Sequence, residues 1–301
     1  MSKQTNGRGG RVNLLLNVAK LALAVSRRHL ADYGSIKSRK DFTQPQLMAC
    51  LILKTYKKTT YRGIMDELAC SAELREVIGL TKVPHWTTVQ KFAARDGTKQ
   101  VAEAMLGTIL EAAMSGDESV ERDELFLSAA MDSTGLQTGS ASAHFVSRSG
   151  QKRKKYVKVS VAILCGALLP ASLVVDWGPS NDKVEASVLM AESQRRLPGV
   201  DVLYADAGYD AEWVHEVARE DWGVMTAIPP VQHKKDGTVG GHYRSKMTPG
   251  WLKAIGYGDR WHVESFFSGM KRTMGWTLGG RSERALFTEA TLKVLTYAIR
   301  R

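Results

Sequence analysis

Two apolar runs that each end in an aspartate constrain the fold of this chain more than any other feature. The first runs from Leu125 to Asp132, and the second runs from Asp201 to Asp206. Each has the character of a buried β-strand, and each is followed within three residues by a glycine. Because open α/β sheets place their sites outside the carboxyl ends of strands, both aspartates are predicted to lie at one sheet edge.

The segments around these runs predict the rest of the sheet. Apolar spacing indicates strands at 156–165, 168–175 and 224–228, and helices at 183–196 and 211–222. Three strands, then alternating helices and strands, then a helix that carries an acid, is the order of a ribonuclease H-like fold. The predicted class is therefore α/β, with a mixed sheet flanked by helices, preceded by an all-α N-terminal domain.

The acid-bearing helix is predicted near the C-terminus. Tyr257, Arg260, Glu264 and Lys271 follow the spacing Y-x2-R-x3-E-x6-K. At about 100° per residue, Glu264 and Lys271 fall within about 40° of Arg260 on a helix, so one face carries an acid between two bases. Taken alone, this spacing fits an ordinary solvated helix with an Arg–Glu pair equally well.

The ends of this helix are also predicted by local signals. The stretch from Arg260 to Met274 has no proline and one internal glycine. Asp259 is the expected N-cap and Gly275 the expected stop.

Together the three acids resemble the catalytic residues of DDE transposases. The C-terminal spacing is similar to the signature of one branch of insertion-sequence transposases, in which the Glu is the third catalytic acid. The string Asp206-Ala-Gly-Tyr209 resembles the D-x-G-Y motif around the second acid, and Met131-Asp132-Ser-Thr134 resembles the surroundings of the first. The resemblance covers about 125–298 and implies a triad of Asp132, Asp206 and Glu264. Asp182 matches a position where the family often has an Asp preceded by His; Asn181 replaces that His here, so Asp182 is left out of the predicted site.

The chemistry implied by the resemblance needs carboxylates. Two divalent ions about 3.5–4 Å apart can activate water or a 3′-hydroxyl and stabilise the leaving oxygen of a phosphodiester. Mg²⁺ prefers oxygen ligands, so the cofactor expected on Asp132, Asp206 and Glu264 is two Mg²⁺ ions, with Mn²⁺ as a substitute. Tyr257, Arg260 and Lys271 are then expected to contact DNA.

Charge supports a polyanionic partner. The formal net charge is +11, and residues 1–119 carry 18 basic and 11 acidic residues, so the N-terminal part is the more basic. Helices are expected at 14–25, from Pro45, from Tyr61, and after Pro84 with a Thr cap. The last segment resembles part of the N-terminal domain common in these transposases. The predicted DNA contacts there are Thr87, Thr88, Lys91 and Arg95. A scaffold or dimerisation bundle with solvated charges is the alternative.

Three ranges divide the chain in this interpretation. Residues 1–115 form a helical DNA-binding and assembly domain, of which 1–11 are expected to be disordered; 116–124 form an acidic linker; and 125–301 form the catalytic domain. A chain that starts near Ser119 is expected to fold, because its sheet core looks complete.

A second basic run, from Arg148 to Lys158, is expected to form a hairpin rim close to Asp132. Its predicted phosphate contacts are Lys152, Arg153 and Lys155, and a charged loop that protects a sheet edge is the alternative.

Other classes find little support in the sequence. The three cysteines show no metal-ligand or redox spacing and are expected to be buried thiols. The apolar stretch at 14–25 is too short to span a bilayer.

The predicted function is a DNA transposase of an insertion sequence, cytoplasmic and associated with the nucleoid. It is expected to act as a homodimer on double-stranded DNA, where it cleaves the terminal inverted repeats and joins the 3′-hydroxyl to target DNA. A ribonuclease H-like nuclease without strand transfer and an inactive DNA-binding derivative are the alternatives.

Overall fold

The computed structural model describes residues 13–115, 127–139, 155–231 and 237–301. The disorder of 1–11, the linker at 116–124 and DNA contact by Lys152 and Arg153 fall outside these ranges, as does most of the hairpin rim predicted from Arg148 to Lys158.

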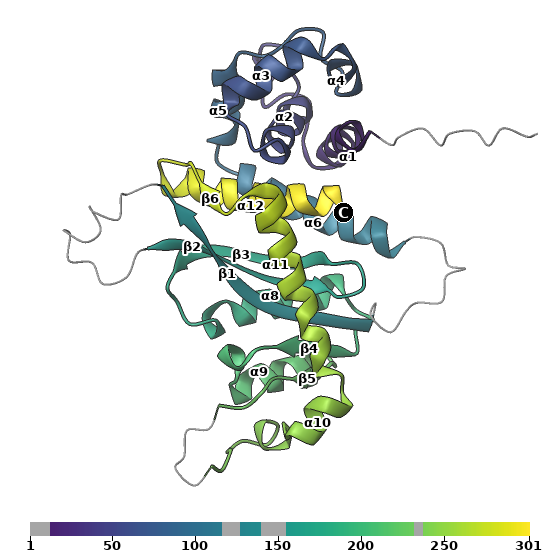
Figure 1. Ribbon diagram of the computed structural model, residues 1–301. Coiled ribbons are helices and arrows are strands. Elements are labelled where there is room, and N and C mark those ends of the chain that lie inside the picture. Colours follow the sequence, from purple (N-terminus) through teal and green to yellow (C-terminus); the bar gives the residue numbers. More distant parts are fainter. Residues whose placement is uncertain (1–12, 116–126, 140–154, 232–236) are drawn as a thin grey trace, which may run out of the picture.

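A mixed sheet forms the centre of the molecule (Figure 1). Its order is β3-β2-β1-β4-β5, with β1, β2 and β3 antiparallel and β4 and β5 parallel to β1. A short strand, β6, pairs with the far end of β1. The strands are β1 (Ser128–Thr138), β2 (Tyr156–Leu164), β3 (Leu169–Gly178), β4 (Val202–Ala205), β5 (Met225–Ala227) and β6 (Thr277–Leu278).

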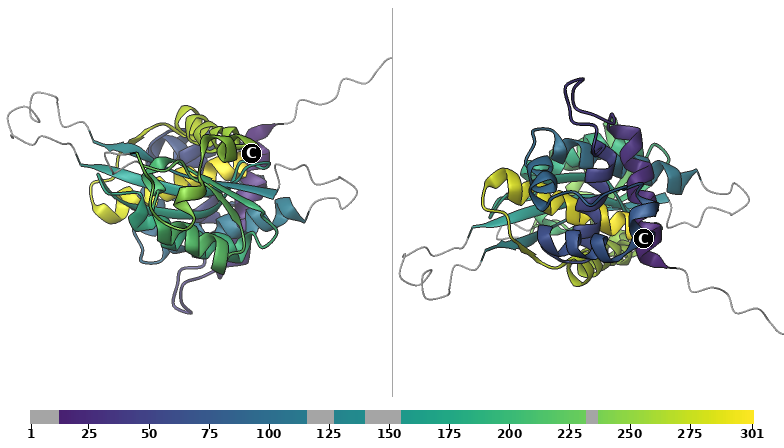
Figure 2. Two further views of the ribbon diagram at one scale, coloured as in Figure 1. Left: turned by 90° about the horizontal axis from the view of Figure 1, so that it is seen from below. Right: turned by 90° about the horizontal axis from the view of Figure 1, so that it is seen from above.

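Helices cover both faces of this sheet, which explains the strongly apolar strands. In Figure 2, α11 lies on one side of the strands and α8 and α9 lie on the other. Strand β2 lies between β1 and β3 and is buried along almost its whole length, including Lys158 and Ser160. The helices are α8 (Lys183–Arg196), α9 (Glu212–Glu216), α10 (Pro249–Ala254) and α11 (Trp261–Met274). The predicted mixed sheet flanked by helices is confirmed.

The N-terminal region is helical, as predicted, and it shares a core with the C-terminus. The C-terminal helix α12 (Glu283–Arg300) and helix α6 (Thr98–Met114) lie between the first five helices and the sheet (Figure 1). Helix α12 packs against α6, α2, β3 and β2, and most of its residues are buried. The other helices are α1 (Leu14–His29), α2 (Gln44–Tyr56), α3 (Tyr61–Cys70), α4 (Ala72–Val77) and α5 (Trp86–Ala93).

This packing opposes the expectation that a chain starting near Ser119 folds by itself. Removal of the N-terminal helices would expose the part of α12 that packs against α1, α2 and α6, on a helix most of whose residues are buried. Local sequence does not show that the partner of α12 lies at the other end of the chain.

Several local predictions need correction. The helix α5 begins after His85, whose side chain accepts a hydrogen bond from the Thr87 amide, so the cap is His and not Thr. The helix predicted at 211–222 is α9 followed by a π-helical turn at Val217–Asp221. Cys50 and Cys165 are buried as expected, whereas Cys70 is exposed.

Candidate active site

Strand pairing brings Asp132 and Asp206 side by side. Strands β1 and β4 pair in parallel from Ser128–Val202 to Met131–Ala205, and the two aspartates are the next residues on each chain. Facing residues of adjacent parallel strands lie about 4.8 Å apart and point to the same face of the sheet. The predicted meeting of two carboxylates therefore follows from the strand register.

Asp132 does not end its strand, contrary to the sequence expectation. Strand β1 continues to Thr138 because β2 pairs with it throughout, from Ala129–Leu164 to Leu136–Val157. The pairing with β4 is what stops before Asp132. Between Met131, where the pairing with β4 ends, and Gln137, where the pairing with β6 begins, this edge of β1 has no strand partner. The two carboxylates lie where the shorter strand, β4, ends.

The environment of Asp132 disfavours its charge. Burial is the largest influence, and together with the charges of Asp206 and Asp182 it raises the pKa of Asp132 to about 6. A hydrogen bond from the Ser133 amide and the charge of Arg260 act in the opposite direction. Ionisation of this carboxyl group therefore costs free energy, and a cation bound between these acids would offset that cost.

Gly208 lies beside the carboxylates of both Asp206 and Asp182. Its amide donates a hydrogen bond of 2.8 Å to Oδ1 of Asp206. A Cβ at this position would lie 2.8 Å from Asp206 Oδ1 and also 2.8 Å from Asp182 Oδ2. A side chain at this position of the Asp-x-Gly-Tyr string would therefore displace the carboxylates of Asp206 and Asp182 from their present places.

The third predicted acid, Glu264, reaches the site through an arginine. Glu264 lies in the first turn of α11 with its side chain 55% exposed, and it pairs with Arg260 one turn earlier. Nη1 of Arg260 also donates a 3.4 Å hydrogen bond to Oδ2 of Asp132. A single guanidinium therefore joins the acid of the helix to the acid of the strand.

The flanks of α11 partly match the sequence prediction. Gly275 ends the helix with a φ of 79°, as expected. Asp259 lies inside a 3₁₀ turn, η5 (Tyr257–Arg260), so it is not the N-cap; Arg260 occupies that position without a side-chain cap. The turn precedes the helix directly, which displaces the helix start by one residue.

Two more members of the signature lie on this unit. Tyr257 hydrogen bonds to Arg260, and burial raises the pKa of its hydroxyl. Lys271 is half-buried, and burial lowers the pKa of its ammonium. Among the side chains that the structure describes, no carboxylate forms an ion pair with Lys271.

Sequence reasoning left out Asp182, which the structure brings to the site. Its Oδ1 accepts a 2.6 Å hydrogen bond from the Ser133 hydroxyl and lies 2.8 Å from the Lys158 ammonium. Lys158 is almost fully buried and also bonds to Glu185, 2.9 Å away. A single Lys within an apolar strand was a signal that the sequence offered, because buried lysines require acidic partners.

Lys158 therefore has a structural partner and is not free for phosphate. Lys155, just before β2, stacks its ammonium 3.9 Å from the centre of the Trp177 ring. Its carbonyl accepts a hydrogen bond from Thr138, six residues beyond Asp132 on β1. At about 3.3 Å per residue this is about 20 Å from the first acid. Lys155 is therefore distant from Asp132, whereas Lys158, at the end of the same run, lies beside Asp182. Residues 148–154 of the predicted rim lie outside the described ranges, and DNA contact by Lys155 stays a prediction.

The predicted contacts of the N-terminal region lie on and after α5. Lys91 is exposed on the helix, and Thr87 and Thr88 are half-buried near its start. Arg95 lies past the end of α5, where it donates to the Gln44 side chain. It lines a cleft of about 610 Å³ between this turn and the start of α12. In Figure 1, α5 lies among the N-terminal helices, and α12 and α6 lie between these helices and the sheet that carries the two aspartates.

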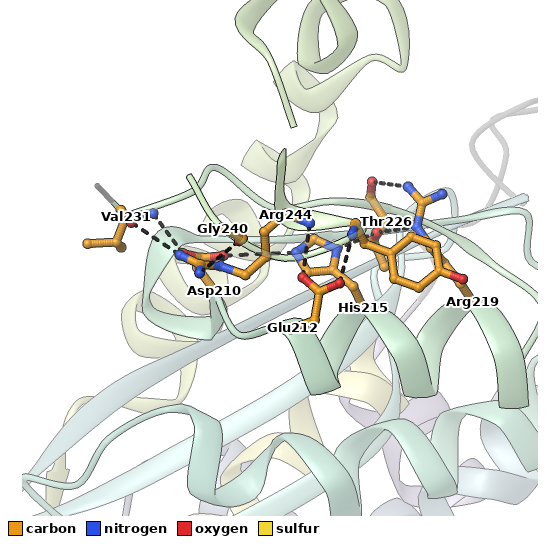
Figure 3. A network of polar contacts seen from close by, with 9 residues as sticks. Asp210, Glu212, His215, Arg219, Thr226, Val231, Gly240 and Arg244 are labelled. Atoms are coloured by element: carbon orange, nitrogen blue, oxygen red, sulfur yellow. Dashed lines mark hydrogen bonds and ion pairs between the residues drawn. The ribbon is translucent and has the colours of Figure 1, made fainter. Parts of the chain in front are cut away.

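A second ion-pair group fixes the chain between Asp206 and Glu264 (Figure 3). We call it the Arg244 cluster; it comprises Asp210, Glu212, His215, Arg219, Thr226 and Arg244. Arg244 binds both oxygens of fully buried Asp210, at 2.7 and 2.6 Å. Glu212 accepts hydrogen bonds from the amides of Tyr243 and Arg244. The cluster ties the turn after Asp206 to the segment that leads into α10 and α11.

The acids of the site suit a hard divalent cation in kind. Carboxylate oxygens are the donors that Mg²⁺ prefers, and the carboxylates of Asp132, Asp206 and Asp182 lie around the point where β4 ends. Within the described ranges, however, no three His, Cys, Asp or Glu side chains are gathered closely enough to hold a metal as they stand. Arg260, between Glu264 and Asp132, supplies positive charge in this arrangement.

A mixed sheet that carries neighbouring aspartates, with a glutamate on a helix against it, defines the DDE class of ribonuclease H-like proteins. The family model described as "Transposase DDE domain" matches residues 128–299, and the chain belongs to this family. It is thus a transposase whose family acts on DNA. No curated protein and no solved structure matches the chain. No helix in the described residues is long and apolar enough to cross a membrane.

Proposed function

We propose that the chain is the transposase of an insertion sequence that cleaves the terminal inverted repeats of its element and joins the 3′-hydroxyl to target DNA. The proposal rests above all on the adjacency of Asp132 and Asp206 where β4 ends. Membership of the family supplies the reaction class. The Y-x2-R-x3-E-x6-K spacing favours the insertion-sequence branch.

In this proposal Asp132, Asp206 and Glu264 would hold two Mg²⁺ ions, which supply an activated water or 3′-hydroxyl and stabilise the leaving oxygen. Because Arg260 pairs with Glu264 and Asp132, its guanidinium holds these acids in place before DNA arrives. A phosphate can replace a carboxylate as the bidentate partner of an arginine. Arg260 would then pass from the acids to the DNA backbone, which releases Glu264 towards the site.

Other side chains have supporting roles. Tyr257 restrains Arg260 from the preceding turn. Lys271, which lacks a carboxylate partner among the described residues, would contact a phosphate of the element end. The exposed Lys91 and Arg95 and the neighbouring Thr87 and Thr88 would bind DNA away from the acids, and two protomers would hold the two ends together.

A cleavage and joining assay tests the proposal. A supercoiled donor that carries the inverted repeats is incubated with Mg²⁺ or Mn²⁺, and nicked, excised and joined products are separated. We expect all three products from the natural chain and none from Asp132→Asn, Asp206→Asn or Glu264→Gln, with end binding retained. Asp201→Asn, an exposed acid at the opposite end of β4, is the matched control.

The outcomes separate the alternatives. Cleavage without joined products would indicate a nuclease, and binding without cleavage would indicate an inactive derivative. Near-normal turnover of any one of the three variants would remove that residue from the triad.

A further inference from the structure

We propose that Asp182 is a fourth metal-binding carboxylate of this site, held in place by Ser133 and by the buried Lys158–Glu185 pair. The inference rests on the proposed function, because it requires that the site binds divalent cations.

The first argument is that the side chain of Asp182 does not cap its own helix. Asp182 is the N-cap of α8, a position where an aspartate ordinarily accepts hydrogen bonds from the first helical amides. Here it makes no cap hydrogen bond. The neighbouring Asn181 accepts from the amide of Lys183 instead. The carboxylate of Asp182 is therefore turned away from its own helix and towards the strands.

The second argument is the asymmetry of its two oxygens. Oδ1 is held by the Ser133 hydroxyl at 2.6 Å and by the Lys158 ammonium at 2.8 Å. Oδ2 accepts no hydrogen bond from the described part of the chain, and it lies beside Gly208 and the Asp206 carboxylate. One oxygen anchored by the protein and the other directed to a neighbouring acid is how metal-ligating carboxylates are held.

The third argument is the placement of Asp182 relative to the sheet. Side chains alternate along β1, so Ser133 points to the face opposite that of Asp132. Asp182 thus approaches from the face that α8 covers, whereas Glu264 approaches from the face that α11 covers (Figure 2). The two faces meet at the edge of β1 that β4 leaves uncovered, where Asp206 lies. Asp182 closes the side of the site that the triad leaves open.

An unsatisfied group points to a ligand at this place. The hydroxyl of Tyr209 is fully buried and has no hydrogen-bond partner among the described residues. The charges of Asp182, Asp132 and Asp206 all act on it. A buried donor among acids, unpaired, is uncommon in folded proteins, and the water shell of a bound cation would supply its partner.

The buried pair explains why the site can hold this additional acid. Lys158 is only 3% exposed and contacts the carboxylates of both Asp182 and Glu185, and Glu185 also accepts from the Ser180 hydroxyl. One positive charge is therefore shared between two carboxylates. The pair fixes Asp182 without neutralising the whole group, and it leaves net negative charge towards the cation.

Titration of the full-length protein with Mn²⁺ alone, followed by electron paramagnetic resonance of free Mn²⁺, tests the inference without any reaction. We expect Asp182→Asn to weaken Mn²⁺ binding by about 10-fold or more, as losses around metal ligands do. Ser133→Ala, which removes only the donor to Oδ1, should weaken binding less. Asp201→Asn should bind as the natural chain does.

The results distinguish this inference from the proposed function. If Asp206→Asn loses Mn²⁺ while Asp182→Asn keeps the natural affinity, Asp182 is only a partner of Lys158 and the inference is overturned. If Asp132→Asn and Asp206→Asn also keep it, the proposed metal chemistry fails as well. Thermal unfolding without metal identifies a variant that does not fold. In that case Ser133→Ala decides, and an affinity equal to that of the natural chain overturns the inference.

Discussion

The Arg244 cluster and the carboxylate site lie only a few residues apart in sequence but treat their acids in opposite ways. In the cluster, Asp210 is fully buried and both its oxygens are bound, by Arg244 and by the Val231 amide. In the site, Asp182 keeps one oxygen unbound, Asp206 lies beside it, and Glu264 is half exposed. The cluster is electrostatically complete, whereas the site has more negative charge than its own cations offset.

We therefore expect the Arg244 cluster to contribute to stability and the carboxylate site to contribute to ligand binding. A completed ion pair fixes the backbone, and its loss leaves a buried charge alone. A group of acids without enough cationic partners lowers the stability of the metal-free fold through mutual repulsion, and the same negative charge attracts a cationic ligand. The following predictions either break this contrast or measure it.

The largest effect on stability is expected in the Arg244 cluster. Asp210→Ala leaves the Arg244 guanidinium without its buried partner, and we expect the free energy of unfolding to fall by about 3–5 kcal/mol. Mn²⁺ affinity of the protein that remains folded should not change. Chemical denaturation with Asp201→Asn as control measures this; a loss of less than about 1 kcal/mol would show that the cluster is not a clamp.

A change of opposite sign is expected in the site. Asp132→Asn removes a charge that burial and neighbouring acids disfavour, so the metal-free protein should gain about 1–2 kcal/mol at pH 8 while cleavage is lost. The same denaturation experiment measures it. Loss of stability on this substitution would contradict the excess of negative charge that we assign to the site.

The pH dependence of stability should also differ between the two regions. Burial lowers the pKa of His215 to about 4, despite the opposing charge of Asp210 and with Arg219 acting in the same direction as burial. The unfolded chain therefore binds more protons between about pH 6.5 and 4, and the free energy of unfolding falls as the pH is lowered through this range. Asp132 has the opposite effect. Because its pKa is raised to about 6, the folded state binds more protons than the unfolded chain, and the contribution of Asp132 to the free energy of unfolding falls as the pH rises from about 4 to 6.

Two variants separate these contributions in the metal-free protein. His215→Gln should flatten the loss of stability on the acid side, and Asp132→Asn should remove the loss as the pH rises. The measurement is the slope of unfolding free energy against pH, so a uniform change in stability does not affect it. A slope that neither variant alters would contradict both assignments.

The smallest effect is expected for the basic side chain of Lys271, and it concerns DNA binding. Lys271→Ala should reduce the salt dependence of DNA-end binding by about one counterion, because Lys271 has no carboxylate partner in the described chain. Arg219→Gln is the control from the Arg244 cluster, where Arg219 is bonded to Thr226, and it should leave the slope unchanged. Equal slopes for natural chain and Lys271→Ala would remove this residue from the DNA contacts.

Local sequence patterns predicted much of the sheet and the adjacency of two acids. Asp132 and Asp206 were predictable because each follows an apolar run and a nearby glycine, and parallel strands align such ends. The end of β1 was not predictable, since only pairing with β2 keeps Ser133 and Thr134 in the strand. Lys155 was placed too close to the acids for the same reason.

The sequence by itself determined the class of fold and predicted the three acids of the triad, because burial periodicity and strand ends are properties of short segments. The family match agrees with that class. Tertiary structure alone decided the placement of Asp182 beside Ser133 and Lys158, the burial of Lys158, and the bridge from Arg260 to Asp132, two residues that are 128 positions apart. It also decided that α12 packs on the N-terminal helices. The physical reason is that a periodic pattern reports how much of a side chain is buried, whereas the partner of a buried charge depends on which distant element packs against it.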